Sequence, residues 1–176
     1  MSRKDSKLNM PKDMQSPQTG HPYYPNLRMR RLRTANWIRE IVTENRVTPS
    51  DLILPLFVIE GSKKDEPIQS MPNVTRQSID NACETAKQAN DLGIPAIALF
   101  PAIDSRLKND QGSEATNPDN LICRAIAAIK SAVPDIGIIT DVALDPYTSH
   151  GHDGIIDDNG TILNDETVDI LCRQAL

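Results

Sequence analysis

Apolar positions fall into two kinds of run along the chain. Uninterrupted apolar runs of strand length occur at residues 51–59, 94–101 and 136–144. Such runs predict strands that are buried on both faces, as in a parallel sheet covered by helices. Apolar residues with helical spacing recur at residues 28–46, 78–92, 118–133 and beyond Asn164. These segments predict amphipathic helices between and after the strands.

Capping and turn residues mark the ends of these elements. Ser78 is expected as the N-cap of the second helix, and Gly93 as the residue that ends it. Asn117 is expected to cap the third helix, because Pro118 after it suits a first helical turn.

Further turn signals lie outside these helices. Asn164 or Asp165 is expected to cap the last helix, and the DDNG turn at residues 157–160 predicts a small hairpin. The long polar loop at residues 60–77 has room for another hairpin. Pro55 interrupts the first apolar run, and since proline cannot donate to a ladder we expect a first or irregular strand there.

The order of strand, polar loop and helix occurs three times. This alternation predicts an α/β fold with a parallel sheet, as either a (β/α) barrel or a doubly wound sheet. Neither GxGxxG nor GxxxxGK[ST] is present, which disfavours the nucleotide-binding versions of the doubly wound sheet. Long polar loops after the strands, such as residues 102–117, favour the rim of a barrel.

Charge divides the chain of 176 residues into a basic start and an acidic body. Residues 1–46 contain ten Lys and Arg against four Asp and Glu, whereas residues 47–176 contain nine against twenty. We interpret residues 1–34 as an extended basic arm, and residues 35–176 as part of one catalytic domain. The arm is expected to pack on its own body or on a neighbouring subunit, because aromatic residues, which stack on nucleic acid bases, make up only 3% of the chain.

The number and spacing of the cysteines, together with hydropathy, indicate the cellular compartment of the protein. Cys83, Cys123 and Cys172 are odd in number and form no CxxC, which favours reduced core residues over disulfides or a thiolate metal site. No apolar run approaches the roughly 18 residues of a membrane span, and no secretory signal is recognisable. We therefore expect a cytoplasmic protein that binds neither membranes nor nucleic acid.

The stretch IITDVALDPYTSHGHDG, residues 138–154, concentrates the polar chemistry of the chain. It carries three carboxylates and two imidazoles: Asp141, Asp145, His150, His152 and Asp153. An oxygen-rich set after a strand is suited to a divalent cation such as Mg²⁺ or Mn²⁺, or to holding and protonating a small polar substrate. The structural alternative is that Asp141 caps the loop backbone and the histidines bond to neighbouring carbonyl groups. We favour a functional interpretation.

Several segments together resemble one enzyme family. They are DLILPLFVIEG, SMPNVTRQSID, GIPAIALFP, GSEATNPDNLICRAI, ITDVALDPYTSHGHDG and NDETVDILCRQAL. In this order, from about Arg30 to Leu176, they resemble porphobilinogen synthase, also called delta-aminolevulinic acid dehydratase. The resemblance implies a (β/α)8 TIM barrel, of which the chain holds about the first three βα units. It also implies an arm that wraps a neighbouring subunit, usually in a homo-octamer.

The same resemblance implies the reaction. Members of the family condense two molecules of 5-aminolevulinate into porphobilinogen, with loss of two waters, in tetrapyrrole and heme synthesis. They work through Schiff-base lysines in the second half of the barrel. No lysine of this chain follows a buried strand directly, so we expect the 176-residue chain to be inactive alone.

One departure from the pattern bears on the metal. Zinc-using members have cysteines where this chain has Ala143, Asp145 and Asp153. Because thiolates select Zn²⁺, the sequence resembles the aspartate-rich branch, in which Mg²⁺, in some members with a monovalent cation, supports activity. Asp145 and Asp153 are the expected metal ligands.

The remaining site residues are assigned by the same resemblance. Asp141, Asp145 and Asp153 are expected in supporting catalytic roles. Tyr147, Ser149 and His152 are expected to bind substrate.

Two other interpretations remain open. The chain can be a non-catalytic fragment that docks on full-length subunits. It can instead be a metal-dependent hydrolase that uses Asp141, Asp145, His152 and Asp153. Because the chain stops within a predicted helix and before a fourth strand, we expect that a second chain or a longer protein completes the sheet.

Overall fold

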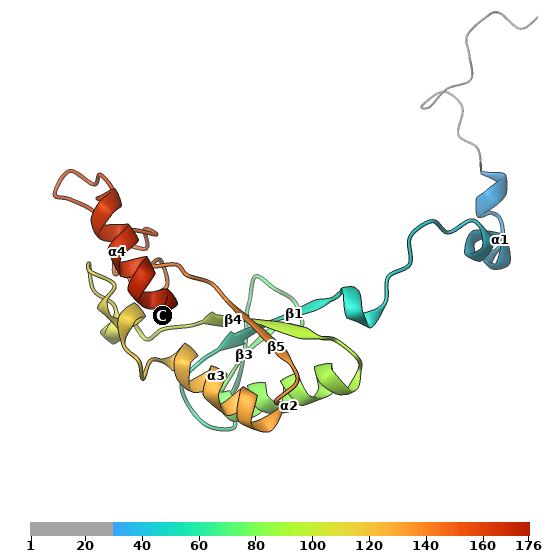
Figure 1. Ribbon diagram of the computed structural model, residues 1–176, viewed down its shortest axis with the longest axis horizontal. Helices are drawn as coiled ribbons and strands as arrows, with labels where there is room; N and C mark the ends of the chain where they lie inside the picture. The colour runs from blue at the N-terminus through green and yellow to red at the C-terminus, as the bar shows by residue number, and fades with distance from the viewer. Residues whose placement is uncertain (1–29) are drawn as a thin grey trace, which may run out of the picture. The chain divides into compact units, whose positions relative to one another are not determined.

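A computed structural model describes residues 30–176 of the chain (Figure 1). The chain divides into two compact units, residues 1–46 and residues 47–176. In the first unit, a 3-10 turn η2 (Arg31–Arg33) is followed by the short helix α1 (Asn36–Ile41). Trp37 and Ile41 are exposed on α1. The helix expected within residues 28–46 is therefore present over six residues. The arm boundary at residue 34 stays a prediction, and most of the arm lies outside the described residues.

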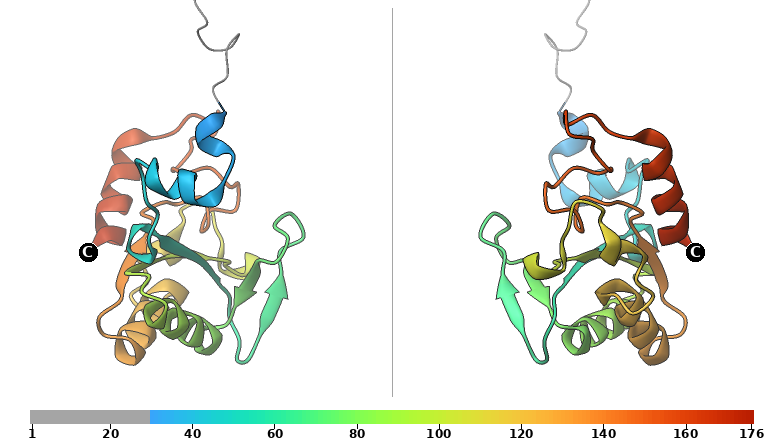
Figure 2. Two further views of the ribbon diagram at one scale, coloured as in Figure 1. Left: turned by 90° about the vertical axis from the view of Figure 1, so that its right-hand side faces the viewer. Right: turned by 90° about the vertical axis from the view of Figure 1, so that its left-hand side faces the viewer.

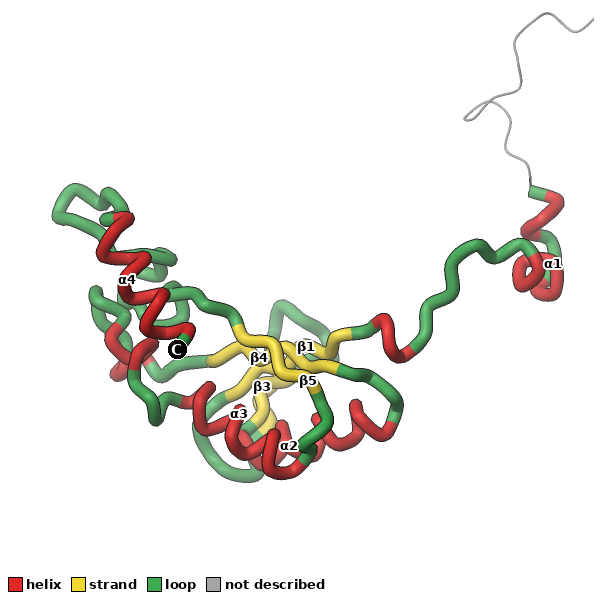
Figure 3. The backbone as a smooth tube through the Cα atoms, in the orientation of Figure 1, coloured by secondary structure: helices red, strands yellow, loops and turns green. Residues whose placement is uncertain are grey.

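The second unit is built on a five-stranded sheet in the order β2-β3-β1-β4-β5. Its strands are β1 (Ile53–Val58), β2 (Asp65–Pro67), β3 (Thr75–Gln77), β4 (Ala96–Pro101) and β5 (Gly137–Thr140). β3, β1, β4 and β5 are parallel, and β2 pairs antiparallel with β3. Figure 3 shows the strands of this sheet in yellow, with the helices in red. The predicted parallel sheet is thus confirmed for the three long apolar runs. The sheet is mixed overall, because the loop at residues 60–77 does contain a hairpin.

Helices α2 (Ile79–Asp91) and α3 (Leu121–Ala132) cover one face of the sheet (Figure 2). Alternate strand residues such as Val58 and Ile97 point into this core, where the small side chains of α2, including Ala82 and Ala86, are fully buried. The opposite face is also apolar, yet Ile139 on it is 46% exposed. The prediction of strands buried on both faces is therefore wrong for the described residues, which cover one face only.

Pro55 lies in β1, a strand in the interior of the sheet, where proline is usually excluded. β1 pairs with β4 along its whole length, but with β3 only from Phe57 onward. Pro55 therefore has a partner strand on one side only, and its missing N–H interrupts no ladder on the other side. The expectation of a first or irregular strand is confirmed in its first part, since β1 is the first strand and pairs in unbroken register with β4.

The last helix, α4 (Asn164–Ala175), does not cover the sheet. It lies beyond the carboxyl end of β5 (Figure 1), where Ile170 and Leu171 pack against a second apolar cluster. That cluster is made by loop residues: Ala115, Leu144, Tyr147 and Ile155. Three 3-10 turns complete the unit, namely η3 (Pro49–Asp51), η4 (Ser105–Leu107) and η5 (Ser113–Thr116).

Three predicted element ends differ from the structure. α3 begins after Asn120, whose Oδ1 accepts a hydrogen bond from Cys123 N at 2.8 Å. Asn117, the expected cap, instead accepts from Asp119 N in the preceding turn. The N-cap of α4 is Leu163, and β5 ends at Thr140, four residues before the end of its apolar run.

Other predicted ends are confirmed. Ser78 is the N-cap residue of α2, although its hydroxyl bonds to Lys64 rather than to the helix backbone. Gly93 follows the helix at a φ of +83°, a conformation that favours glycine. The DDNG turn lies in a small hairpin closed by a bridge between Ile156 and Ile162. Within residues 30–176, no helix is long and apolar enough to cross a membrane.

Replacement of Ile97 by alanine should show how far stability depends on the covered face. Ile97 has no exposed surface, so Ile97→Ala leaves a cavity and should lower the free energy of unfolding by about 2–5 kcal/mol. Ile139→Ala, on the open face of the neighbouring strand, should lower it by about 1 kcal/mol or less. Urea denaturation of the chain followed by circular dichroism measures both, and equal losses would contradict the one-sided core.

Candidate functional site

The loops after β4 and β5 lie side by side at the carboxyl edge of the sheet. Asn109, in the loop after β4, forms a parallel bridge with Thr148 in the loop after β5. Asn109 N donates to Tyr147 O at 3.3 Å, and Ser149 N donates to Asn109 O at 3.1 Å. Both polar loops therefore lie on one rim, as the placement of long polar loops after parallel strands leads one to expect. Side chains from both are brought to the same place, although about 40 residues separate them in sequence.

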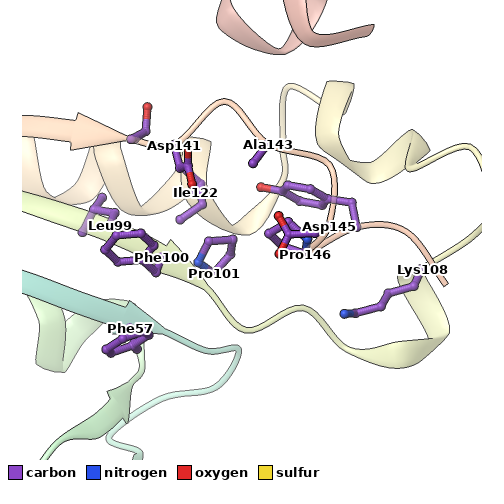
Figure 4. Close-up of a pocket in the computed structure, with 12 residues that line it drawn as sticks. Phe57, Leu99, Phe100, Pro101, Lys108, Ile122, Asp141, Ala143, Asp145 and Pro146 are labelled. Atoms are coloured by element: carbon purple, nitrogen blue, oxygen red, sulfur yellow. The ribbon is translucent and has the colours of Figure 1, made fainter. Parts of the chain in front are cut away.

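A cavity of about 300 Å³ opens between these loops and the strand ends (Figure 4). It is lined by Phe57, Leu99, Phe100, Pro101, Lys108, Ile122, Thr140, Asp141, Ala143, Asp145, Pro146 and Tyr147. One side is apolar, where the rings of Phe57 and Phe100 lie 5.6 Å apart on the open face of the sheet. The other side carries two carboxylates and one ammonium group. This combination can hold a small molecule that has both charged and apolar parts.

Asp145 is the carboxylate whose protonation is most affected by the site. Partial burial raises the pKa of Asp145 above its ordinary value, and the negative charges of Asp153 and Asp141 raise it further. The positive charge of Lys108 acts in the opposite direction. Figure 4 shows both Asp145 and Lys108 at the cavity, on loops that follow different strands. The direction of this shift makes the protonated form of Asp145 less unfavourable than that of an ordinary aspartate.

Asp153 is bound to the backbone of the same loop. Its Oδ1 accepts a hydrogen bond from Leu144 N at 2.6 Å, which closes the loop between residues 144 and 153. Thr148 Oγ1 donates to His152 O at 2.8 Å and strengthens this closure. Asp153 therefore lies beside Asp145, as its effect on the pKa of Asp145 also shows, but it does not line the cavity.

Tyr147 lines the cavity and belongs to the apolar cluster of the loops. It is only 3% exposed. Burial raises the pKa of Tyr147 to about 12, with the charges of Cys123 and Glu114 in the same direction and the side chain of Gln174 in the opposite one. The phenol is therefore a neutral hydroxyl at the edge of the cavity, able to donate one hydrogen bond.

Ser149 and His152 lie away from the cavity. Ser149 Oγ donates to an Asp110 carboxylate oxygen. His152 N donates to His150 Nδ1 at 3.1 Å, which leaves the proton of that ring on Nε2, and His150 Nε2 donates to Asp110 O at 3.3 Å. The contact of His150 with a carbonyl oxygen matches the structural alternative for that histidine, whereas the hydrogen bonds of His152 involve its backbone. The substrate-binding roles of Ser149 and His152 stay predictions.

Metal binding was expected at Asp145 and Asp153. Among residues 30–176, no three His, Cys, Asp or Glu side chains come together as a group that could hold a metal ion. The charge of Asp153 does act on Asp145, whose pKa it raises, so both carboxylates belong to the same part of the loop. Mg²⁺ is commonly held by one or two carboxylates with several waters, so the pair fits Mg²⁺ better than a structural zinc site with four protein ligands.

Lys108 is a site residue that sequence reasoning did not identify. It follows β4 by seven residues, so it does not stand at a strand end, but the turn η4 brings it back to the rim. It also lines an adjoining cavity of about 580 Å³ together with Lys64, Glu66, Arg76 and Asp104. The signal in the sequence that could have pointed to Lys108 is that its loop, like the loop after β5, follows a strand of the parallel sheet. The fold of the loop, which the sequence does not reveal, decides which of its residues turns inward.

The burial of Tyr147 should appear in the pH dependence of stability. Because the unfolded chain ionises near pH 10 and the folded chain near pH 12, the free energy of unfolding is unaffected below about pH 10. It should then fall by up to roughly 3 kcal/mol as the pH rises to about 12. Tyr147→Phe removes the titrating group and should lose less stability over that interval. Denaturation of both proteins from pH 9 to 12, in parallel, tests this, and identical slopes would refute it.

Comparison with known proteins identifies the family. A family model described as delta-aminolevulinic acid dehydratase matches residues 26–176. A dehydratase of that name from Bradyrhizobium diazoefficiens is 57% identical over 150 residues, which cover 85% of this chain and 42% of the relative. Another from Rhodobacter capsulatus is 41% identical over 155 residues, which cover 88% of this chain and 46% of the relative.

A solved structure shares the fold. The delta-aminolevulinic acid dehydratase (porphobilinogen synthase) of Toxoplasma gondii, in complex with the reaction product porphobilinogen, aligns with a TM-score of 0.77 at 47% identity. The alignment covers 84% of this chain and 42% of that one, so the chain spans less than half the length of its relatives. The predicted α/β class and the partial barrel are confirmed by this match. The chain belongs to the delta-aminolevulinic acid dehydratase family.

Proposed function

We propose that this chain supplies part of the active site of a porphobilinogen synthase, which condenses two 5-aminolevulinate molecules with loss of two waters in tetrapyrrole synthesis. Membership of the family and the product bound to the Toxoplasma gondii relative support this proposal. The observation that carries it is the cavity at the carboxyl ends of β4 and β5, where Asp141, Asp145 and Lys108 meet. In barrel enzymes, catalytic side chains lie at this end of the strands.

The chemistry assigns different tasks to the charged residues. Loss of water from a carbinol requires a proton donor, and formation of a carbon–carbon bond next to a carbonyl requires a proton acceptor. Asp145, whose pKa is raised, is suited to hold and deliver a proton. Asp141 is the partner carboxylate that accepts one. Lys108 is placed to bind the substrate carboxylate, while Phe57 and Phe100 exclude water from its carbon chain.

Covalent catalysis is assigned to residues beyond this chain. The resemblance implies Schiff-base lysines in the second half of the barrel. Of the described lysines, Lys87 and Lys130 lie on helices α2 and α3, and only Lys108 lines the 300 Å³ cavity, where its charge faces Asp145. A neutral amine is needed for attack on a ketone. We therefore propose that the 176-residue chain by itself forms no porphobilinogen.

Magnesium is the proposed metal. Asp145 and Asp153 would hold it through carboxylate oxygens when both are ionised, and its charge would offset the repulsion between these two groups. Because a metal ligand must be deprotonated, Mg²⁺ and the transferred proton would occupy Asp145 at different times. When bound, the ion would stabilise negative charge near the cavity. A monovalent cation is a second candidate, by resemblance alone.

Assembly and location are also proposals. A homo-oligomer, an octamer in the family, is proposed by resemblance. A cytoplasmic location stays a prediction, since relatives from plants such as Glycine max are chloroplastic.

The role of Asp145 can be measured in a completed enzyme. Residues 1–176 are fused to the remaining portion of the Bradyrhizobium diazoefficiens relative, and porphobilinogen formation is followed with Mg²⁺ present. Asp145→Asn keeps the shape of the side chain but cannot exchange a proton, so kcat should fall by about 10²-fold or more. The exposed turn residue Asp158, in Asp158→Asn, provides the matched control and should leave kcat unchanged.

Two results would count against the proposed function. An inactive fusion that folds and assembles would argue that this chain does not supply the required groups. An active Asp145→Asn fusion would remove Asp145 from the proton transfer. Porphobilinogen formed by the 176-residue chain alone would refute its proposed inactivity.

Introducing cysteines at positions 143, 145 and 153, where zinc-using members of the family have them, should change the metal preference of the site. The triple variant Ala143→Cys, Asp145→Cys and Asp153→Cys should bind Zn²⁺ at least tenfold more tightly than the original fusion, about 1.4 kcal/mol in binding free energy. A triple serine variant at the same positions is the control, because it replaces each sulfur by an oxygen. Competition with a zinc-binding dye measures both. Equal zinc affinities would show that these positions do not form a metal-site scaffold.

A further inference from the structure

One peptide bond in the site is held by side chains at both of its polar atoms. Asp153 Oδ1 accepts from Leu144 N at 2.6 Å, and Gln174 Nε2 donates to Ala143 O at 3.1 Å. The N–H of Leu144 and the C=O of Ala143 belong to the same peptide unit. The two gripping residues are distant in sequence from it, Asp153 by 9 residues and Gln174 by 31. No secondary structure includes this peptide, so these two contacts replace a ladder.

The orientation of the Gln174 amide is forced by its partner. If the amide were turned around, its oxygen would face the Ala143 oxygen and repel it, so the NH₂ group must face the carbonyl. In this orientation Gln174 Oε1 is buried and has no hydrogen-bond partner among the described residues. The same side chain also lies near the Tyr147 hydroxyl, whose pKa it lowers, so Gln174 joins α4 to two residues of the rim loop.

The neighbouring backbone makes this peptide a fixed point for the cavity. Leu144 is fully buried in the loop cluster, and its carbonyl oxygen accepts from both Tyr147 N at 2.8 Å and Thr148 N at 2.9 Å. The next residue, Asp145, begins this tight turn and lines the cavity. Rotation of the 143–144 peptide would therefore change the direction from which Asp145 enters the cavity.

We propose that Gln174 is a positioning residue of the site: with Asp153 it fixes the 143–144 peptide, and thereby the placement of Asp145. The effect on turnover rests on the proposed function, whereas the effect on the peptide itself does not. The proposal also gives a reason for the unusual place of α4. By packing on the rim loops rather than on the sheet, α4 brings Gln174 to the carbonyl that it grips.

The peptide is tested first, in the 176-residue chain. Gln174→Met has a similar length but no donor, so the Ala143 carbonyl ¹³C resonance should shift upfield and the Leu144 amide should exchange with solvent roughly tenfold faster. Arg173→Met, at the adjacent exposed position of α4, is the matched control and should change neither. Exchange of the Ile129 amide in α3 reports on general destabilisation and should be the same in both variants.

Two variants of Asp153 separate hydrogen bonding from charge. Asp153→Asn retains an oxygen that can accept from Leu144 N, and should keep the slow exchange of that amide. Asp153→Ala should lose it. If Gln174→Met leaves the Ala143 resonance and the Leu144 exchange unchanged, or if Asp153→Asn and Asp153→Ala exchange equally, the proposal is wrong.

Turnover is tested second, in the fusion with the Bradyrhizobium diazoefficiens portion. Gln174→Met should lower kcat by about tenfold with little change in KM, because Asp145 is displaced while the rest of the cavity is intact. Arg173→Met should retain the original kcat. An unchanged kcat with an altered Leu144 exchange would refute the positioning role. A fusion that is inactive without any substitution would count against the proposed function and leave the exchange data to decide on the peptide.

Discussion

Leu144 has no exposed surface, and both of its backbone polar groups, like the carbonyl before it, have hydrogen-bond partners. Its N–H is bound by Asp153, its carbonyl oxygen by two amides of the following turn, and the preceding carbonyl by Gln174. A loop that leaves a sheet needs such partners, because a buried N–H or C=O without one costs about 1–3 kcal/mol. Here the partners come from the loop and from α4. The rim is therefore a small folded layer, with its own apolar cluster, stacked on the ends of the strands.

Much of the fold could be predicted because its causes are local. The three apolar runs become β1, β4 and β5, and the Ala-rich face of α2 becomes the covering layer, because strand and helix periodicities are properties of short segments. The errors occur where distant contacts decide. Asn117 has the composition of a cap, but Asn120 takes that position because its amide also reaches the carbonyls of Glu114 and Ala115. Likewise, α4 has an ordinary amphipathic pattern, which does not show whether its apolar face packs on a sheet or on a loop cluster.

The residues of the site, like the elements of the fold, divide into those that the sequence predicts and those that it does not. Asp141 and Asp145 were predictable because a polar cluster directly follows a buried strand, and the structure places both at the cavity. Lys108 and Gln174 were not, because each depends on how a loop or helix turns back toward the rim. Ser149 and His152 belong to the same polar cluster, yet neither lines the cavity, and the Ser149 hydroxyl is bound to Asp110 instead. Composition thus locates the loop that carries the chemistry, whereas hydrogen bonding selects the residues that face the cavity.

By resemblance, zinc-using relatives have cysteines at positions 145 and 153. The aspartates at these positions in this chain cross-link the loop in a different way. Three thiolates on one ion would join residues 143, 145 and 153. In this chain the bond from Leu144 N to Asp153 already joins the same two segments, and Gln174 holds residue 143 from the opposite side. The closeness that a metal would impose is thus built from hydrogen bonds within the protein. The carboxylate of Asp153 contributes both to this closure and to the raised pKa of Asp145, so the shape of the loop and the protonation of Asp145 depend on one side chain.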